Sequence, residues 1–292
     1  MSAPPDAATA PVAAGRRLAL AEAARRPRLL AGGLVLATVV LVSVLAPVVA
    51  PFDPNAGDPA IRLSPPGTGG HLLGTDDQGR DVLSRIMWGG RSSLSVAVAG
   101  VAVATALGTA AGLVAGFRRG VLSALLMRFV DALLAFPVIF FALALAQVIS
   151  PGHRVVIATV VFAAVPYIAR IVFAEAKLES RKDYAVGARL LGSGTRTTLL
   201  REVLPNVAPT VVVYSTTLVG LMIVFSSSLS ALGLGVQPPA ADWGRMVSEG
   251  ARVIVSGSPH VALVPGLVIL VVGLAFNWVG DGLRDVIDPR TV

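Results

Sequence analysis

The chain has 292 residues, of which 54% are hydrophobic and only 14% are charged, whereas soluble domains carry about 25% charged residues. This composition and a mean hydropathy of +0.77 indicate several membrane spans, so the net charge of +7 is attributed to basic residues that flank spans, not to nucleic-acid binding. The absence of cysteine excludes disulfides, thiolate metal sites and cysteine nucleophiles.

Six apolar runs are each long enough to cross a bilayer as a helix, which takes about 20 residues. In chain order they are 29–50, 92–117, 121–150, 155–173, 208–236 and 261–280. A basic stretch precedes the first run, but the run is long for a signal peptide and Pro51 stands where cleavage would occur. The prediction is therefore an all-α integral membrane protein with six transmembrane helices.

Lys and Arg are distributed unevenly over the segments that connect these runs. Seventeen of the 24 fall in the two terminal tails and two alternate loops, and seven fall in the other loops. Because basic loops stay on the cytoplasmic side, we expect the N- and C-termini to be cytoplasmic. The predicted segments are an N-terminal tail (1–28), a first span (29–50), an extracytoplasmic segment (51–91), a five-helix core (92–281) and a C-terminal tail (282–292).

Three smaller features of the spans lead to specific expectations. The outer segment ends in an amphipathic stretch, 79–88, that we expect to form a helix along the outer interface. Trp88 and Trp243 are placed at the outer edge of the membrane and Trp278 at the inner edge. The acidic residue within the third run, Asp131, is expected to pair with Arg128 on the same helix face and not to serve a proton relay.

The second run carries a small residue at every fourth position. These residues are Gly100, Ala104, Gly108, Gly112 and Gly116. They form one stripe along a helix face, which allows another backbone to approach closely. The helix that packs there belongs either to the same chain, which we favour, or to a partner subunit.

A polar and basic stretch, DYAVGARLLGSGTRTTLLREVLPN, interrupts the apolar sequence at 183–206. Asp183 is predicted to cap a helix over 184–191, and Gly192 stands where a glycine commonly ends a helix. A second helical stretch is expected at 197–204, before Pro205 introduces the next span.

The first of these two helices has a face of small residues. Ala185, Ala188 and Gly192 share that face, with Tyr184, Arg189 and Leu190 beside it. Such a face suits insertion into a groove on another protein. The alternative is a helical hairpin that lies on the inner membrane surface.

The sequence contains no motif for covalent chemistry. Lys177 and Lys182 follow alanine and arginine, so a P-loop, which needs Gly-Lys, is absent. The GxSxG motif is absent as well, and the three histidines form no metal-binding pattern. We therefore expect a non-catalytic chain that holds no cofactor and no metal and that does not hydrolyse ATP by itself.

Several stretches resemble a known family. VGARLLG followed by REVLP is similar to the EAA loop of ABC-importer permeases, with Gly192 and Pro205 in the expected places and Val186 and Gly187 replacing the Glu and the first Ala. HLLGTDDQGRDVLSRIMWGGRSSLSV, RFVDALLAFP, LSALGLGVQPPAADWGRM and PGLVILVVGLAFNWVGDGLRDVIDPR resemble the C-type permease subunit of dipeptide, oligopeptide and nickel ABC importers. The resemblance extends from about Arg28 to Arg290.

The resemblance implies a type I ABC importer permease in a bacterial cytoplasmic membrane, with its core at 92–281 and a coupling loop at 175–206. The implied partners are a homologous B-type permease, two ABC ATPase subunits that hold ATP and Mg, and an extracytoplasmic substrate-binding protein. The coupling helix that docks on the ATPases would comprise Asp183, Tyr184, Ala185, Val186, Gly187, Ala188, Arg189, Leu190, Leu191 and Gly192. The expected cargo is a dipeptide or oligopeptide, with nickel or glutathione as alternatives. A stand-alone secondary transporter or channel is the alternative from another class, and it would require ion-coupling residues in mid-membrane.

Overall fold

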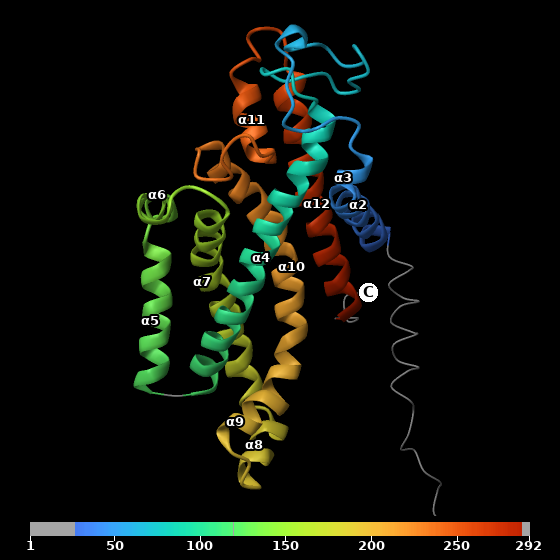
Figure 1. Cartoon of the computed structure of the whole chain (residues 1–292). Coiled ribbons are helices and arrows are strands. Elements are labelled where there is room, and N and C mark those ends of the chain that lie inside the picture. The colour runs from blue at the N-terminus through green and yellow to red at the C-terminus, as the bar shows by residue number, and fades with distance from the viewer. Residues whose placement is uncertain (1–26, 119, 288–292) are drawn as a thin grey trace, which may run out of the picture.

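The computed structural model describes residues 27–118 and 120–287, and the regular secondary structure within them is helical apart from two isolated β-bridges (Figure 1). The elements are α2 (Pro27–Val44), α3 (Ala46–Val49), η1 (Pro59–Ile61), α4 (Val82–Phe117), α5 (Val121–Ala135), α6 (Val138–Ile149), α7 (His153–Glu179), α8 (Asp183–Leu190), α9 (Thr195–Thr197), η2 (Thr198–Val203), α10 (Leu204–Ala231), α11 (Trp243–Ala251) and α12 (His260–Ile287). The all-α prediction is confirmed. Most of the predicted N-terminal tail lies outside the described residues, and α12 extends into the predicted C-terminal tail as far as Ile287.

Five helical segments are long and apolar enough to cross a membrane, and the α5–α6 pair is a sixth if it forms one span. This third predicted span is not a continuous helix, because the chain bends by 85° between α5 and α6. The bend occurs at Phe136 and Pro137, where Phe136 has the extended backbone conformation that a following proline favours. The sequence prediction placed the apolar run correctly but missed this break.

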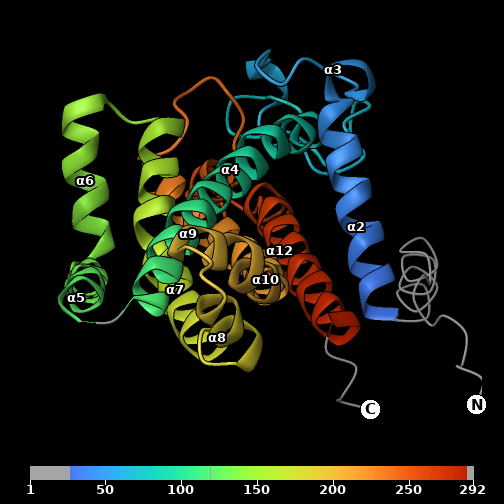
Figure 2. The ribbon, with the colours of Figure 1, turned by 90° about the horizontal axis from the view of Figure 1, so that it is seen from below.

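Helices α4, α7, α10 and α12 form the centre of the molecule. Helix α4 packs along α7, α10 packs on α12, and α2 packs against the outer side of α12. Figure 2 shows α2 on one flank of this bundle and α5 with α6 on the opposite flank. The most deeply buried side chains of the centre are aliphatic, among them Val101, Val160, Ile168, Val172 and Ile223.

The small-residue stripe of α4 lies against α7. A Cβ atom at Gly100 would lie 2.5 Å from Cγ1 of Val160, and one at Gly112 would lie 2.6 Å from the carbonyl oxygen of Ala169. All five residues of the stripe are buried within the chain. Close packing of α4 on α7 therefore depends on the absence of larger side chains there.

The outer helix predicted at 79–88 is not separate from the second span. Helix α4 begins at Val82 and continues to Phe117, with its N-terminus capped by Asp81, whose Oδ2 accepts a hydrogen bond of 2.7 Å from the backbone N–H of Ser84. The helix continues through Gly89 and Gly90, where other elements approach closely. A Cβ atom at Gly89 would lie 3.0 Å from the Trp243 ring. The expectation of a separate helix at 79–88 was wrong.

Two further expectations about single residues were also wrong. Trp243 does not present its ring to lipid: it is 1% exposed, and its Nε1 donates a 2.9 Å hydrogen bond to the carbonyl oxygen of Ile86. Asp131 pairs with Arg170 of α7, whose Nη2 lies 2.6 Å from Asp131 Oδ1, and not with Arg128. In both cases a helix distant in sequence supplies the partner, because α11 packs on α4 and α5 packs on α7.

Candidate functional site

The polar stretch of the sequence forms a hairpin at the end of the molecule opposite to residues 51–81 (Figure 1). We call α8, α9 and η2, with the turn between them, the polar hairpin. Helix α8 ends before Gly192, which has a φ of +84° and so adopts the left-handed conformation that favours glycine. Helix α9 continues through the π-helical turn η2 into α10. Asp183 is the first residue of α8 and not its cap, because the capping position is Lys182.

Polar contacts tie α8 to the end of α7. Glu179, the last residue of α7, accepts a 2.6 Å hydrogen bond from Nζ of Lys182 and another from the hydroxyl of Tyr184. Burial, together with that hydrogen bond, raises the pKa of Tyr184, so its hydroxyl stays protonated and can donate. Arg189 donates to the carbonyl oxygen of Ser180 at 2.7 Å and lies over the ring of Phe117 on α4.

These contacts orient the exposed face of α8. Leu190 and Leu191 are 83% and 90% exposed, although both are large and apolar. Val186 is also exposed, and Cβ atoms at Gly187 and Gly192 would have no neighbouring atom within 4 Å. We call these five residues the exposed face of α8. An exposed apolar surface that is surrounded by polar residues is typical of a protein contact.

The structure changes which side of α8 can make such a contact. Ala185, which the sequence placed on the docking face, is 0% exposed, and α8 packs against η2. Ala188 is half-buried, so the small-residue face points partly toward the chain itself. Positions three or four residues apart identify a helix face but do not show whether it points inward or outward. Ala185 is therefore removed from the contact face, and the docking role of the remaining residues stays a prediction.

A second polar cluster lies at the opposite end, where residues 76–85 meet α11. Arg80 Nε lies 2.6 Å from Asp76 Oδ2, and Arg80 Nη2 lies 3.2 Å from Glu249 Oε2. Arg85, which is 1% exposed, lies 3.4 Å from the same Asp76 oxygen. These ion pairs join the outer segment, α4 and α11.

Three carboxylates of this cluster could in principle hold a cation, since oxygens of Asp76, Asp77 and Glu249 lie within 4.8 Å of one another. Burial, followed by the neighbouring charges of Asp76 and Glu249, raises the pKa of Asp77. The guanidinium groups of Arg80 and Arg85 already supply the positive charge that a divalent ion would bring. The arrangement therefore fits an ion-pair network better than a metal site.

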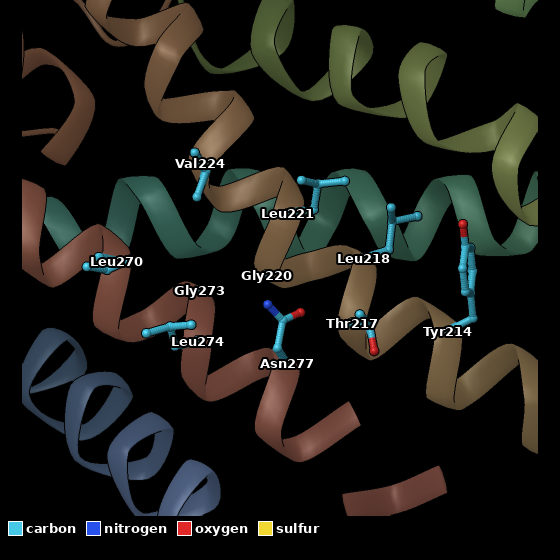
Figure 3. A pocket seen from close by; sticks show the side chains of 10 residues that line it. All are labelled: Tyr214, Thr217, Leu218, Gly220, Leu221, Val224, Leu270, Gly273, Leu274 and Asn277. Atoms are coloured by element: carbon cyan, nitrogen blue, oxygen red, sulfur yellow. The ribbon is translucent and has the colours of Figure 1, made fainter. Parts of the chain in front are cut away.

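A cavity of about 360 Å³ lies between α10 and α12, in the middle of the spans (Figure 3). Its walls are largely leucine and valine, and Tyr214, Thr217 and Asn277 add polar groups. Helices α10 and α12 meet closely beside it, because a Cβ atom at Gly220 would lie 2.7 Å from the carbonyl oxygen of Gly273. The sequence analysis did not single out these residues. The signal that could have found them is three polar side chains within otherwise apolar runs.

Comparison with known proteins shows similarity along nearly the whole chain. Residues 108–292 match the family described as "Binding-protein-dependent transport system inner membrane component", and residues 17–66 match "N-terminal TM domain of oligopeptide transport permease C". The chain is 37% identical to the glutathione transport system permease protein GsiD of Pectobacterium atrosepticum, over 89% of this chain and 86% of that protein. It is 35% identical to the dipeptide transport system permease protein DppC of Haemophilus influenzae, over 89% and 90%. It is 36% identical to the di/tripeptide transport system permease protein DppC of Pseudomonas aeruginosa, over 89% and 88%.

Proposed function

Because the chain belongs to the family of binding-protein-dependent transport system inner membrane components, we propose that it forms half of the translocation path of an ATP-driven peptide importer. The observation that carries this proposal is the similarity to peptide permeases over 89% of the chain. A homologous permease would complete the path, and a binding protein would deliver the cargo. Two ATPase subunits would hold ATP and Mg and dock on the exposed face of α8.

ATP binding would close the two ATPases on each other, and the polar hairpin would transmit that movement to the spans. Helix α8 is bonded to α7 through Glu179, and η2 continues into α10. A displacement of α8 therefore moves the cytoplasmic ends of two central helices together. This is the kind of two-state element that partner subunits can bias.

Glutathione is the second candidate cargo, because one relative is a glutathione permease. Nickel, the other alternative from the sequence, has no support among the three relatives described above. The cognate binding protein distinguishes these cargoes. We expect its melting temperature to rise with short peptides; a rise with glutathione or nickel alone would assign the other cargo.

The dependence of uptake on ATP or on an ion gradient distinguishes this proposal from a stand-alone secondary transporter. The complete importer, reconstituted in vesicles, should take up peptide with ATP present and should keep doing so after ionophores collapse the ion gradients. Asp131, an acid that an ion-coupled carrier could use, is paired with Arg170 at 2.6 Å. Uptake that follows an ion gradient without ATP would overturn the proposal.

The proposed orientation places the polar hairpin in the cytoplasm and residues 51–81 outside. The chain has no cysteine, so single introduced cysteines need no background removal. In intact cells, an impermeant thiol reagent should label Gly69→Cys and Ser256→Cys, and should label Thr195→Cys only after the membrane is permeabilised. All three positions are exposed within the chain. Labelling of Thr195→Cys from outside would reverse the topology.

A further inference from the structure

A cavity of about 330 Å³ opens at the same end of the molecule as the polar hairpin, where α4 and α7 end and α5 begins. Three basic side chains line it, those of Arg118, Lys177 and Arg181. No acidic side chain is among the described residues that line this cavity. We call it the basic pocket.

No acidic side chain among the described residues pairs with any of these three cations. Lys182 pairs with Glu179, and Arg189 donates to backbone carbonyls. Within the described part of the chain, no side-chain ion pair or hydrogen bond is formed by Arg118, Lys177 or Arg181, and Lys177 lies only over the Phe173 ring, 5.4 Å from its centroid. Concentrated positive charge beside a cavity attracts an anion of matching size.

The remaining walls of the basic pocket are small or apolar. Gly120 and Ala124 leave room at the start of α5, and Met127 and Phe173 form an apolar part of the wall. Outside the pocket, Leu125 and Phe129 are 61% and 63% exposed and continue the apolar surface along α5. A ligand with a negative head and long apolar tails would match both parts.

We propose that the basic pocket binds the phosphate headgroup of an anionic phospholipid, whose acyl chains lie along α5. Basic pockets between membrane helices on the cytoplasmic side are suited to such headgroups. A docked protein would also meet the cations, but it would not account for an apolar surface that continues along a membrane-spanning helix. A bound lipid would link the start of α5 to the ends of α4 and α7.

The test is native mass spectrometry of the full chain, purified with its partner permease and titrated with phosphatidylglycerol or phosphatidylcholine. We expect selective retention of phosphatidylglycerol, and about a thirtyfold loss of its affinity in K177Q/R181Q, since each of the two basic contacts near a membrane surface contributes about 1 kcal/mol. The matched control R196Q/R201Q removes the same charge from the polar hairpin, outside this pocket, and should bind as the wild type does. Ala124→Trp keeps every charge but fills the pocket, and it should weaken binding as well, whereas the neighbouring Leu125→Trp should not.

Several outcomes would overturn this assignment. Equal losses in K177Q/R181Q and R196Q/R201Q, or full binding by Ala124→Trp, would show general surface attraction without a pocket. Displacement of the lipid by millimolar inorganic phosphate would assign the site to the free anion. Unchanged lipid binding by K177Q/R181Q, with loss of the ATPase subunits, would make the pocket a protein contact.

Discussion

The double variant Leu190→Asp/Leu191→Asp is expected to have an ATP-driven uptake rate about tenfold lower than the wild type, while it remains folded in the membrane. Both side chains are more than four-fifths exposed in the chain, so changing them should alter the free energy of unfolding by less than about 0.5 kcal/mol. In a docked complex the same side chains would be buried, and a loss of about 1.4 kcal/mol of binding free energy at the two positions together already weakens an interface tenfold. The measurements are uptake in reconstituted vesicles and retention of the ATPase subunits on the purified permease pair.

A matched control separates docking from the added charge. Thr195→Asp/Thr197→Asp introduces two carboxylates on α9, at exposed positions of the same hairpin outside the exposed face of α8. We expect this variant to keep both uptake and the ATPase subunits. Wild-type uptake and ATPase retention by the leucine variant would show that the face makes no essential contact. The membrane-surface hairpin would then be the better account.

The features predicted correctly from the sequence are those that neighbouring residues determine. Gly192 ends α8 because its φ of +84° suits glycine, and this preference is visible in the sequence itself. The apolar runs were found because a helix must satisfy its own backbone in lipid, whatever surrounds it. The family resemblance, and with it the permease function, depended on motifs of the same local kind.

The features that the sequence analysis missed depend on contacts between distant segments. Asp131 lies near Arg128 in sequence, but packing of α5 on α7 brings Arg170 to it. Tryptophan is a residue type that is common at membrane interfaces. Here, however, α4 provides a glycine-lined space for the Trp243 ring and a carbonyl acceptor for its Nε1. Ala185 points inward because η2 packs on α8. The break at Pro137 had a local signal, the proline itself, but a proline inside an apolar run does not always break a helix, as Pro166 within α7 shows.

The second large effect is expected at the crossing of α4 and α7, where Gly112→Leu should strongly reduce the amount of folded protein. A Cβ atom at Gly112 would lie 2.6 Å from the carbonyl oxygen of Ala169, 2.7 Å from Cβ of Val172 and 2.9 Å from the backbone nitrogen of Phe173. Two of these three atoms belong to the α7 backbone, so they cannot move aside as the end of a flexible side chain would. The two helices would have to separate, and overpacking of a core typically costs about 1–3 kcal/mol.

The effect should depend on the size and the direction of the new side chain. Gly112→Ala should be less harmful than Gly112→Leu, because it adds one carbon where leucine adds four. Ala110→Leu is the matched control, since Ala110 lies on the same helix but is exposed within the chain. The measurements are the yield of monodisperse protein after detergent extraction and its melting temperature. If Gly112→Leu and Ala110→Leu give the same yield and the same melting temperature, α4 and α7 are not packed as closely as the structure shows. The small-residue stripe of α4 would then have to contact another subunit.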